Sequence, residues 1–355
     1  MVVSLPLHVT TRERKSIMNR SFITACANAT SMTIKILMLL SIVAAILPLP
    51  AAMAAVDSYP GKPVRLIIPF APGGISDIIG RVIAVKLSER LGAQVVVENR
   101  GGAGGIIGME MAAKAKPDGY TLLFTTAAFA TNPSLFKVPF DPIKSFVPIA
   151  RAGVGVNVLT VHPGVPVHSV KELIALAKKQ PGKLACSAAG AGSFGHLAIE
   201  YFKSMAGVDF KTVQFKGGGP AAIDTMGGHT QIHFSALVTT LPHIKSGKLR
   251  ALGVSGAARS KAAPDLPTIA ESGVPGYEAS IWLGFLAPAG TPTAVVDRIT
   301  RELGVLLASE ETRKSLENHG VEADLLGPAE FGKFIEAEIA KWAKVVKEGN
   351  IKAEE

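Results

Sequence analysis

The sequence predicts an α/β fold of two lobes joined by two crossover strands. Short apolar runs alternate with helical patterns along most of the chain, which is typical of α/β folds with mostly parallel sheets. Two long extended stretches, residues 146–163 and 278–288, separate one α/β series from the other. We therefore assign residues 55–158 and 280–355 to a discontinuous first lobe and residues 159–279 to a second lobe.

The first lobe is expected to open with strand–helix pairs. The run VRLIIPF at residues 64–70 is continuously apolar, as a strand covered on both faces requires. Further elements are predicted as a helix at about 77–91, a strand at 94–99, a helix near 107–115 and a strand at 120–126.

The second lobe repeats the pattern. Ser169 and Glu172 form a capping-box pattern that predicts the start of a helix ending near Gln180. Strands are predicted in LACSAA, TVQFK, QIHFS and RALGVSG, and helices after GAGSFGH, at GGGP and in LPHIKSGK. Helices at about 293–308, 310–318 and 329–348 close the chain, and we expect them to return to the first lobe.

The N-terminal segment predicts export. Residues 36–47 form an apolar core that follows Lys35 and precedes Ala52-Met53-Ala54, the arrangement of a secretory signal peptide. The core has about 12 residues, fewer than the ~20 that span a bilayer, so a membrane anchor is the weaker alternative. We expect cleavage near Ala54. The true start is left open among Met1, Met18 and Met32.

Charge and cysteine content narrow the possible partners. Loss of residues 1–54 removes five basic residues and one acidic residue, which lowers the net charge from +9 to +5. The remaining basic residues are scattered, which favours small anions over nucleic acid. Cys26 leaves with the leader and only Cys186 stays, so no intramolecular disulfide is expected.

Four glycine-rich turns stand where a predicted strand meets a predicted helix. The first N–H groups of a helix lack partners and lie at the positive end of its dipole. Glycine lets an anion approach them closely, and ligands of open α/β sheets bind beyond the carboxyl ends of the strands. We predict that these turns hold a carboxylate in one cleft without needing arginine. The turns are APGGISD, NRGGAGGIIG, AAGAGSFGH and KGGGPAA.

Cofactor and metal chemistry fit these residues less well. The GAGSFG turn has the spacing of a dinucleotide site, but Lys216 ends the next strand where an acid is expected. His229 and His233 have the i, i+4 spacing of a zinc helix, yet they lack its glutamate and fall in a predicted strand. We therefore predict neither a cofactor nor a metal.

Catalytic residues are not expected either. A nucleophile elbow at Ser193 would need glycine in place of Ala191. Cys186 and His196 are better interpreted as a small buried cysteine and an unrelated histidine than as a catalytic pair. Trp282 either lines the cleft or supports the core, and the sequence leaves both interpretations open.

The chain resembles the periplasmic receptors of tripartite tricarboxylate transporters, often called the Bug family. The most specific matching pieces are PF-x-PGG-x-x-D, PDGYTLL and GKLRAL at these relative positions. Other matching pieces extend over nearly all of the chain after the leader. They are ENRGGAGG, TNPSLF, FDPIKSFVPI, SAAGAGSFGHLA, FKGGGPAAIDTMGGH, DLPTIAESGVPGYE and WLGFLAPAGTP.

This resemblance implies a type II periplasmic-binding-protein fold, in which two lobes close on a small organic anion. It also implies a periplasmic, non-catalytic, monomeric receptor that delivers a mono-, di- or tricarboxylate to integral membrane transporter subunits. Family members bind the near carboxylate through backbone groups and ordered water. A signalling receptor with the same binding chemistry and a secreted α/β enzyme are the alternatives.

The resemblance also implies a set of ligand-binding residues on each lobe. Asp77 is expected to cap a helix and orient the first turn, and Ser235 stands where many relatives carry an acid, which favours a plain carboxylate over an amino acid. The first-lobe set is Pro72, Gly73, Gly74, Ser76 and Asp77, with Thr125, Thr126 and Asn132 in the loop after the third strand. The second-lobe set is Ser187, Ala189, Gly190 and Ser193, opposite Gly217, Gly218 and Ser235.

Overall fold

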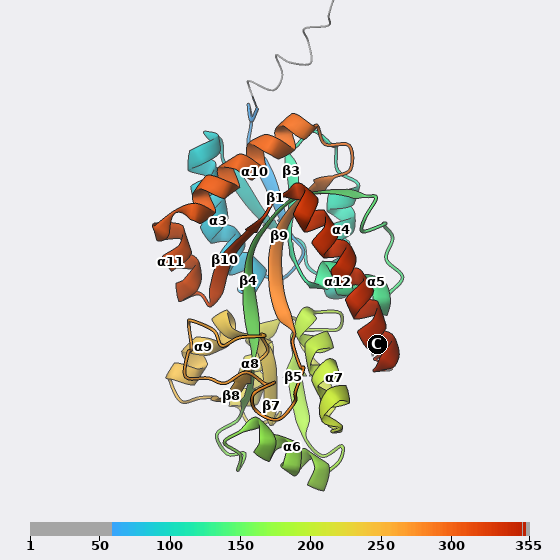
Figure 1. Ribbon diagram of the computed structural model, residues 1–355, viewed down its shortest axis with the longest axis vertical. Coiled ribbons are helices and arrows are strands. Elements are labelled where there is room, and N and C mark those ends of the chain that lie inside the picture. Colours follow the sequence, from blue (N-terminus) through green and yellow to red (C-terminus); the bar gives the residue numbers. More distant parts are fainter. Residues whose placement is uncertain (1–58, 350, 353–355) are drawn as a thin grey trace, which may run out of the picture. The chain divides into compact units, whose positions relative to one another are not determined.

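The computed structural model describes residues 59–349 and 351–352 (Figure 1). The expected leader, its cleavage near Ala54 and Cys26 lie outside these residues. The strands are β1 (Val64–Ile68), β2 (Val95–Asn99), β3 (Thr121–Thr126), β4 (Phe146–Val161), β5 (Ala185–Ala188), β6 (Lys211–Gln214), β7 (Ile232–Ala236), β8 (Arg250–Val254), β9 (Ser280–Pro288) and β10 (Val321–Leu326).

The helices alternate with these strands, as the sequence pattern predicts. They are α3 (Ile75–Leu91), the 3-10 turn η1 (Ala103–Gly105), α4 (Ile106–Ala113), α5 (Ala128–Leu135), α6 (Val170–Lys179), α7 (Phe194–Ala206), α8 (Gly218–Met226), α9 (Leu237–Lys245), α10 (Thr293–Ala308), α11 (Glu310–Asn318) and α12 (Pro328–Glu348).

Strand β4 belongs to both lobes. Residues 146–156 pair with β9, and residues 157–161 pair with β7. Strands β10 and β8 also pair with β4, in the first and second lobe respectively. The strand order is therefore β2-β1-β3-β9-β4-β7-β5-β6 along one continuous path. The two α/β lobes and the long shared strand agree with the sequence prediction, while the exact lobe boundaries stay a prediction.

The sheets are mixed and not mostly parallel, so that part of the prediction is wrong. Strand β1 is parallel to β2 and β3, and β5 is parallel to β6 and β7. In contrast, all the pairings of β4 and the pairing of β3 with β9 are antiparallel. The reason is that β4 enters the second lobe and β9 returns from it, so the two run side by side in opposite directions.

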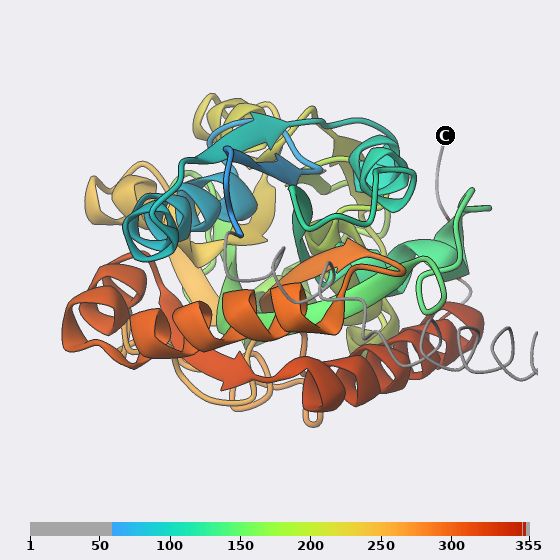
Figure 2. The same ribbon diagram turned by 90° about the horizontal axis from the view of Figure 1, so that it is seen from above.

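Helices cover both faces of the first-lobe sheet. Ile83 of α3 and Ile299 of α10 belong to the apolar cluster on one face, whereas Met109 of α4 and Phe331 of α12 belong to the cluster on the other (Figure 2). The cluster that contains Met109 and Phe331 continues into the second lobe as far as Phe202 of α7. Within the described residues, no helix is both long and apolar enough to cross a membrane.

Trp282 supports the core. Its side chain is buried in β9, and its ring lies 5.4 Å from the Phe331 ring and 6.0 Å from the Phe334 ring of α12. These contacts favour the core interpretation of the two that the sequence left open, while the buried indole N–H has no hydrogen-bond partner.

The predicted capping box is present with one shift. The Ser169 hydroxyl accepts a hydrogen bond from the Glu172 N–H at 3.2 Å. The Glu172 carboxylate accepts from the N–H of His168, one residue before the cap, at 2.7 Å. Side chains therefore accept hydrogen bonds from two backbone N–H groups at the start of α6, those of His168 and Glu172.

Helix α5 was not predicted. The segment after β3 was expected to be a loop, and a proline such as Pro133 breaks a helix when it stands in the interior. Pro133 lies in the last turn of α5, and the helix ends two residues later. Helices α7 and α9 also begin earlier than expected, at Phe194 and Leu237.

Two features at the C-terminal end also differ from the prediction. Strand β10 was missed because VEADLL is short and partly polar, and it is stabilised by pairing with the edge of β4. Helix α12 returns to the first lobe as expected, but Trp342 near its end packs on Phe194 of the second lobe.

Replacing Gly284 with alanine should destabilise the protein by about 1–3 kcal/mol, the usual cost of overpacking a core. A methyl group at Gly284 of β9 would overlap the ring of Phe331, which is fully buried and cannot easily move. Urea unfolding of the variant measures the effect.

The control is Gly332→Ala in α12, where the added methyl meets only Pro148, at an ordinary 3.5 Å. This control should keep or slightly raise the free energy of unfolding, since alanine is the better helix former. Equal stability of the Gly284→Ala variant and the wild type would show that β9 and α12 are not this closely packed.

Candidate functional site

The strand directions bring the carboxyl ends of both lobes to the same boundary. Strand β4 runs from the first lobe into the second, so β7 and its parallel neighbour β5 run toward the first lobe. In the first lobe, β9 is antiparallel to β4 and β3 is antiparallel to β9, so β3 and β1 run toward the second lobe. The turns that follow these strands therefore meet where the lobes join.

The four glycine turns form a contiguous series. An ideal Cβ on Gly101 would lie 3.2 Å from the Ala71 nitrogen, so the second turn touches the first. One on Gly104 would lie 3.0 Å from the Ala191 oxygen, so the second turn touches the third across the lobe boundary. One on Gly190 would lie 2.9 Å from the Phe215 oxygen, next to the fourth turn.

Asp77 holds the first turn from inside α3. The N-cap residue is Gly74, and Asp77 sits in the first helical turn, so the prediction that Asp77 caps the helix is only partly right. Its carboxylate accepts from the Gly73 N–H at 2.9 Å and from the Asn99 side-chain amide at 2.9 Å. Arg81 pairs with the same carboxylate at 2.8 Å.

This network decides which first-turn donors are free. The Gly73 N–H is used by Asp77, whereas the N–H groups of residues 75–77 in the first turn of α3 have no partner within the helix, and the first helical bond is donated by Ile78 to the Gly74 oxygen. Ser76 is buried beside them, and Pro72 and Gly73 are exposed. An anion on this turn would therefore contact the helix start and not the Gly73 N–H.

The predicted residues after β3 lie on two elements. Thr125 and Thr126 end β3, and Asn132 lies in α5 and not in a loop. The Asn132 amide donates to the Gly104 oxygen at 2.9 Å, and a Cβ on Gly192 would lie 3.0 Å from the Asn132 side-chain oxygen. Asn132 thus joins the second turn of the first lobe to the third turn, in the second lobe.

Several polar atoms at this boundary are buried without a hydrogen-bond partner. They include the hydroxyl of Thr125, the side-chain oxygen of Asn132 and the side-chain nitrogen of Asn157, the residue where β4 enters the second sheet. Buried polar groups normally find a partner, so these atoms mark a place suited to a polar guest or water.

The third turn contains Ala189, Gly190 and Ser193. The Ser193 hydroxyl accepts from the His196 N–H at 3.2 Å and so caps α7. Ser187 is different. It is fully buried, and its hydroxyl contacts Thr225 of α8 and His233 of β7, each at 2.8 Å, so its side chain serves the interior of the lobe.

The fourth turn brings Gly217 and Gly218 to the end of β7. A Cβ on Gly218 would lie 2.7 Å from the Ser235 hydroxyl. Ser235 is buried and lies next to the start of α8, and its role in binding stays a prediction. Most of the predicted residues lie on the glycine turns or on the helix starts that follow them. Asn132 and Ser235 contact these turns from α5 and β7. Thr125 and Thr126 end β3, and the Ser187 side chain points into the second lobe.

The Ser187–His233 contact does not form an accessible catalytic pair. Both side chains are fully buried, which keeps a substrate away from them. Burial, helped by the positive charge of His243, lowers the pKa of His233 to about 4. Burial likewise raises the pKa of the Cys186 thiol, which disfavours a thiolate. Across residues 59–349 and 351–352, no cluster of histidine, cysteine and acidic residues could hold a metal ion.

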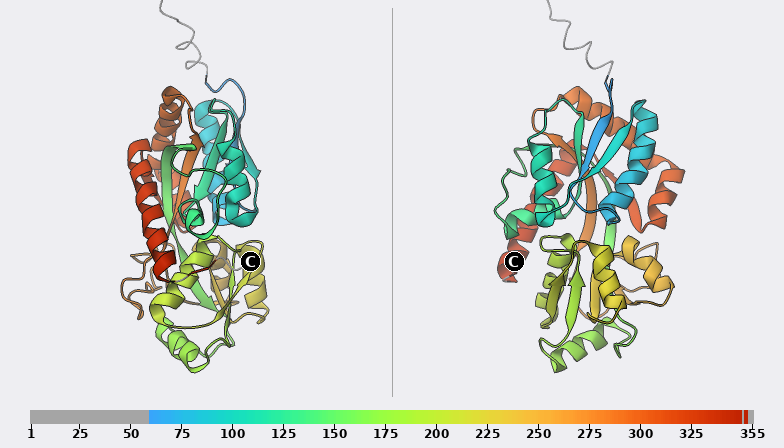
Figure 3. Two further views of the ribbon diagram at one scale, coloured as in Figure 1. Left: turned by 90° about the vertical axis from the view of Figure 1, so that its right-hand side faces the viewer. Right: turned by 180° about the vertical axis from the view of Figure 1, so that it is seen from behind.

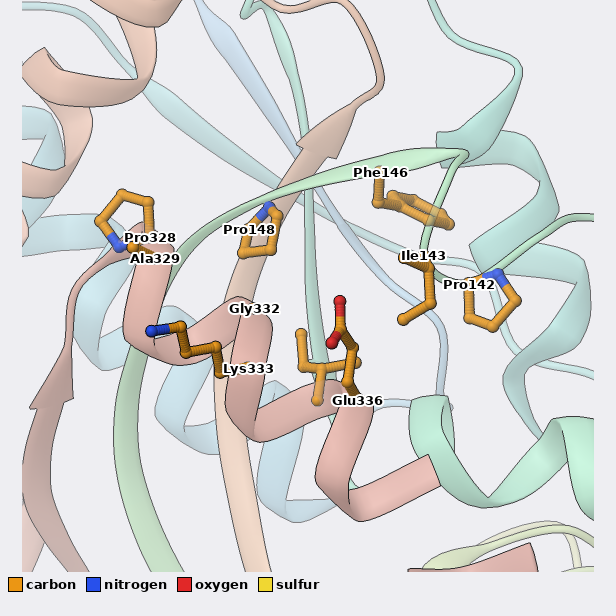
Figure 4. A pocket seen from close by; sticks show the side chains of 10 residues that line it. Pro142, Ile143, Phe146, Pro148, Pro328, Ala329, Gly332, Lys333 and Glu336 are labelled. Atoms are coloured by element: carbon orange, nitrogen blue, oxygen red, sulfur yellow. The ribbon is translucent and has the colours of Figure 1, made fainter. Parts of the chain in front are cut away.

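A separate hollow of about 260 Å³ lies on the first lobe, between α12 and the segment before β4 (Figure 4). Pro142, Ile143 and Pro148 form apolar walls, and the Glu336 side chain points between them (Figure 4). None of the predicted ligand-binding residues lines it. The glycine turns are the better candidate site because they combine free N–H groups with unpartnered polar atoms.

A sequence model described as "Tripartite tricarboxylate transporter family receptor" matches residues 79–351, well over half of the chain. The chain belongs to this receptor family. The resemblance drawn from the sequence is thereby confirmed. Protein BugT of Bordetella pertussis is 37% identical over 305 residues, which cover 85% of this chain and 94% of BugT.

Solved structures of similar proteins agree in fold. The periplasmic binding protein BugD matches with a TM-score of 0.77 and 36% identity, over 83% of this chain and 99% of BugD. An R. palustris protein solved with adipate matches with a TM-score of 0.80 and 36% identity, over 83% and 99%. MatC of Rhodopseudomonas palustris, with bound malate, reaches 0.75 and 28%, over 81% and 100%. The predicted periplasmic-binding-protein fold is thus confirmed.

Some residues of the candidate site were missed at the sequence level. Asn99 orients Asp77 from the end of β2, and Gly104 forms the contact between the lobes. The NRGGAGG turn was recognised as a candidate anion turn, but none of its residues entered the predicted set. Asn157 gave no signal in the sequence, since it sits within an apolar strand.

The buried His233 should make stability depend on pH. Its native pKa of about 4 lies below the ordinary 6.5, so between these values the unfolded chain binds one more proton. The contribution of neutral His233 to the free energy of unfolding is therefore fully present above pH 6.5, and it is lost as the pH falls toward 4. The free energy of unfolding should drop by roughly 1.4 kcal/mol per pH unit in this window.

Urea unfolding between pH 7.5 and 4.5 measures this slope. The variant His233→Gln should lose it, whereas His229→Gln, a change at an exposed histidine, should retain it. Identical slopes in His233→Gln and the wild type would contradict the assignment.

Proposed function

We propose that this protein is an exported, non-catalytic receptor that captures a small organic anion between its two lobes. The ligand is a mono-, di- or tricarboxylate, and the receptor delivers it, as a monomer, to the membrane subunits of a tripartite tricarboxylate-type transporter. The contiguous series of glycine turns across the lobe boundary carries this proposal, because it gathers helix starts from both lobes around one place.

The chemistry of these turns favours an anion held by backbone groups. The starts of α3, α7 and α8 supply N–H donors and the positive ends of three helix dipoles. The nearby arginines are already paired, Arg81 with Asp77 and Arg100 with Glu98. A carboxylate would therefore be bound chiefly by N–H groups and by the unpartnered polar atoms of Thr125 and Asn157.

The family supports the ligand class. Adipate and malate, found with the two R. palustris proteins, are both dicarboxylates. Ser235, next to the fourth turn, carries a hydroxyl group and no negative charge. A ligand with an ammonium group would therefore find no negative partner there. A plain carboxylate is therefore a better match than an amino acid.

Export is part of the proposal. Residues 36–47, with cleavage near Ala54, would act as the signal peptide and place the mature receptor in the periplasm. Membership of a periplasmic receptor family supports this location.

Thermal unfolding of residues 55–355 tests the function, with a panel of mono-, di- and tricarboxylates, amino acids and NAD. A ligand at 100 times its dissociation constant adds about 2.7 kcal/mol, and each kcal/mol raises the midpoint by roughly 2–4 °C. A carboxylate should raise the midpoint accordingly. A shift with NAD alone would instead favour the GAGSFG turn as a nucleotide site.

Replacing Gly74 with valine should weaken carboxylate binding at least tenfold and leave the fold intact. The backbone at Gly74 is extended, and an added Cβ would meet only the Ala71 oxygen, at 3.7 Å. The protein therefore has room for the added Cβ, whereas a ligand on the start of α3 would collide with the valine side chain.

Titration calorimetry with the best carboxylate measures the loss. Gly304→Ala in α10, where the methyl meets only Leu325 at 3.5 Å, is the matched control and should bind like the wild type. Unchanged affinity in Gly74→Val would place the ligand elsewhere.

A further inference from the structure

Helix α12 packs on both lobes with one side. Phe331, Ile335, Glu338 and Trp342 are its buried residues, and their spacing of i, i+4, i+7 and i+11 puts them on a single stripe. Phe331 contacts Trp282 of the first lobe, with ring centres 5.4 Å apart. Figure 3 shows α12 running past the junction of the lobes.

Trp342 forms the second-lobe end of this stripe. Its indole is fully buried, with its centre 5.3 Å from the Phe194 ring and 5.9 Å from the Tyr201 ring, both edge to face. The preceding residue, Lys341, pairs with Glu278 at 2.9 Å, just before β9. Two consecutive residues of α12 thus hold the second lobe.

The Trp342 contact lies directly beside the candidate site. Phe194 is the first residue of α7 and follows Ser193, the cap of the third glycine turn. On the other side of this turn, a Cβ on Gly192 would overlap the Phe136 ring and lie 3.0 Å from the Asn132 side-chain oxygen. The third turn is therefore held between α5 and α12.

We propose that Trp342 is a positioning residue of the carboxylate site. It holds the third glycine turn against the first lobe and so raises the fraction of molecules whose lobes are closed. Apparent affinity falls in proportion to the binding-competent fraction, so Trp342 acts on binding without touching the ligand. The ligand part of this inference rests on the proposed function, whereas the effect on lobe closure needs no ligand.

The variant Trp342→Ala should open the lobes and weaken binding. Loss of two edge-to-face ring contacts should lower affinity for adipate roughly tenfold, mainly through faster dissociation. Small-angle scattering without ligand should show a larger radius of gyration than in the wild type. Trp342→Phe keeps an aromatic ring and should restore most of both properties.

Phe334→Ala is the matched control. Phe334 is an aromatic residue of the same helix, but it packs on Trp282, Phe331 and Arg151 of the first lobe. It should lower the unfolding temperature without changing the radius of gyration or the adipate dissociation rate.

An unchanged radius of gyration in Trp342→Ala, or an equal change in Phe334→Ala, would overturn the proposal. Failure of the wild type to bind any carboxylate would refute the proposed function instead. In that case the scattering comparison would still decide the role of Trp342.

Discussion

The antiparallel pairing of β4 with β9 is the interaction on which the rest of the structure depends. Strand β4 then joins the two sheets, since it pairs with β9 up to Val156 and with β7 from Asn157 onward. The parallel neighbours take their direction from these two strands. As a result, the carboxyl ends of both lobes point to one boundary, where every following turn can offer a helix start to the same ligand.

The chemistry at this boundary is mostly that of the backbone. Glycine permits close approach, as between Gly104 and the Ala191 oxygen, and leaves helix N–H groups exposed to an anion. The Asp77 carboxylate does not occupy the N–H groups proposed for the ligand, because it accepts a hydrogen bond from the Gly73 N–H and forms an ion pair with Arg81. Recognition by backbone groups would contain little side-chain information, so our proposal names a class of ligand, the carboxylates, from the chemistry of the turns.

Much of this arrangement could be predicted from the sequence. Apolar runs predicted most strands, and helices with clear periodicity, such as α10 and α11, were predicted to the residue. Features set by tertiary contacts could not be predicted: α5 tolerates Pro133 in its last turn, and β10 is stabilised by its pairing with β4. The glycine turns were visible, but their contiguity was not, because it depends on contacts such as Gly101 with Ala71. The role of Ser187 was also hidden, since only the structure turns its hydroxyl toward Thr225 and His233.

The most direct test follows the backbone amides of both lobes during a titration of the ¹⁵N-labelled mature protein with adipate or malate. The account predicts that the amide signals of residues 74–76 and 190–194 shift together, with one dissociation constant, because both turns hold the same anion. Shifts confined to one lobe, or centred on the hollow beside Glu336, would contradict it.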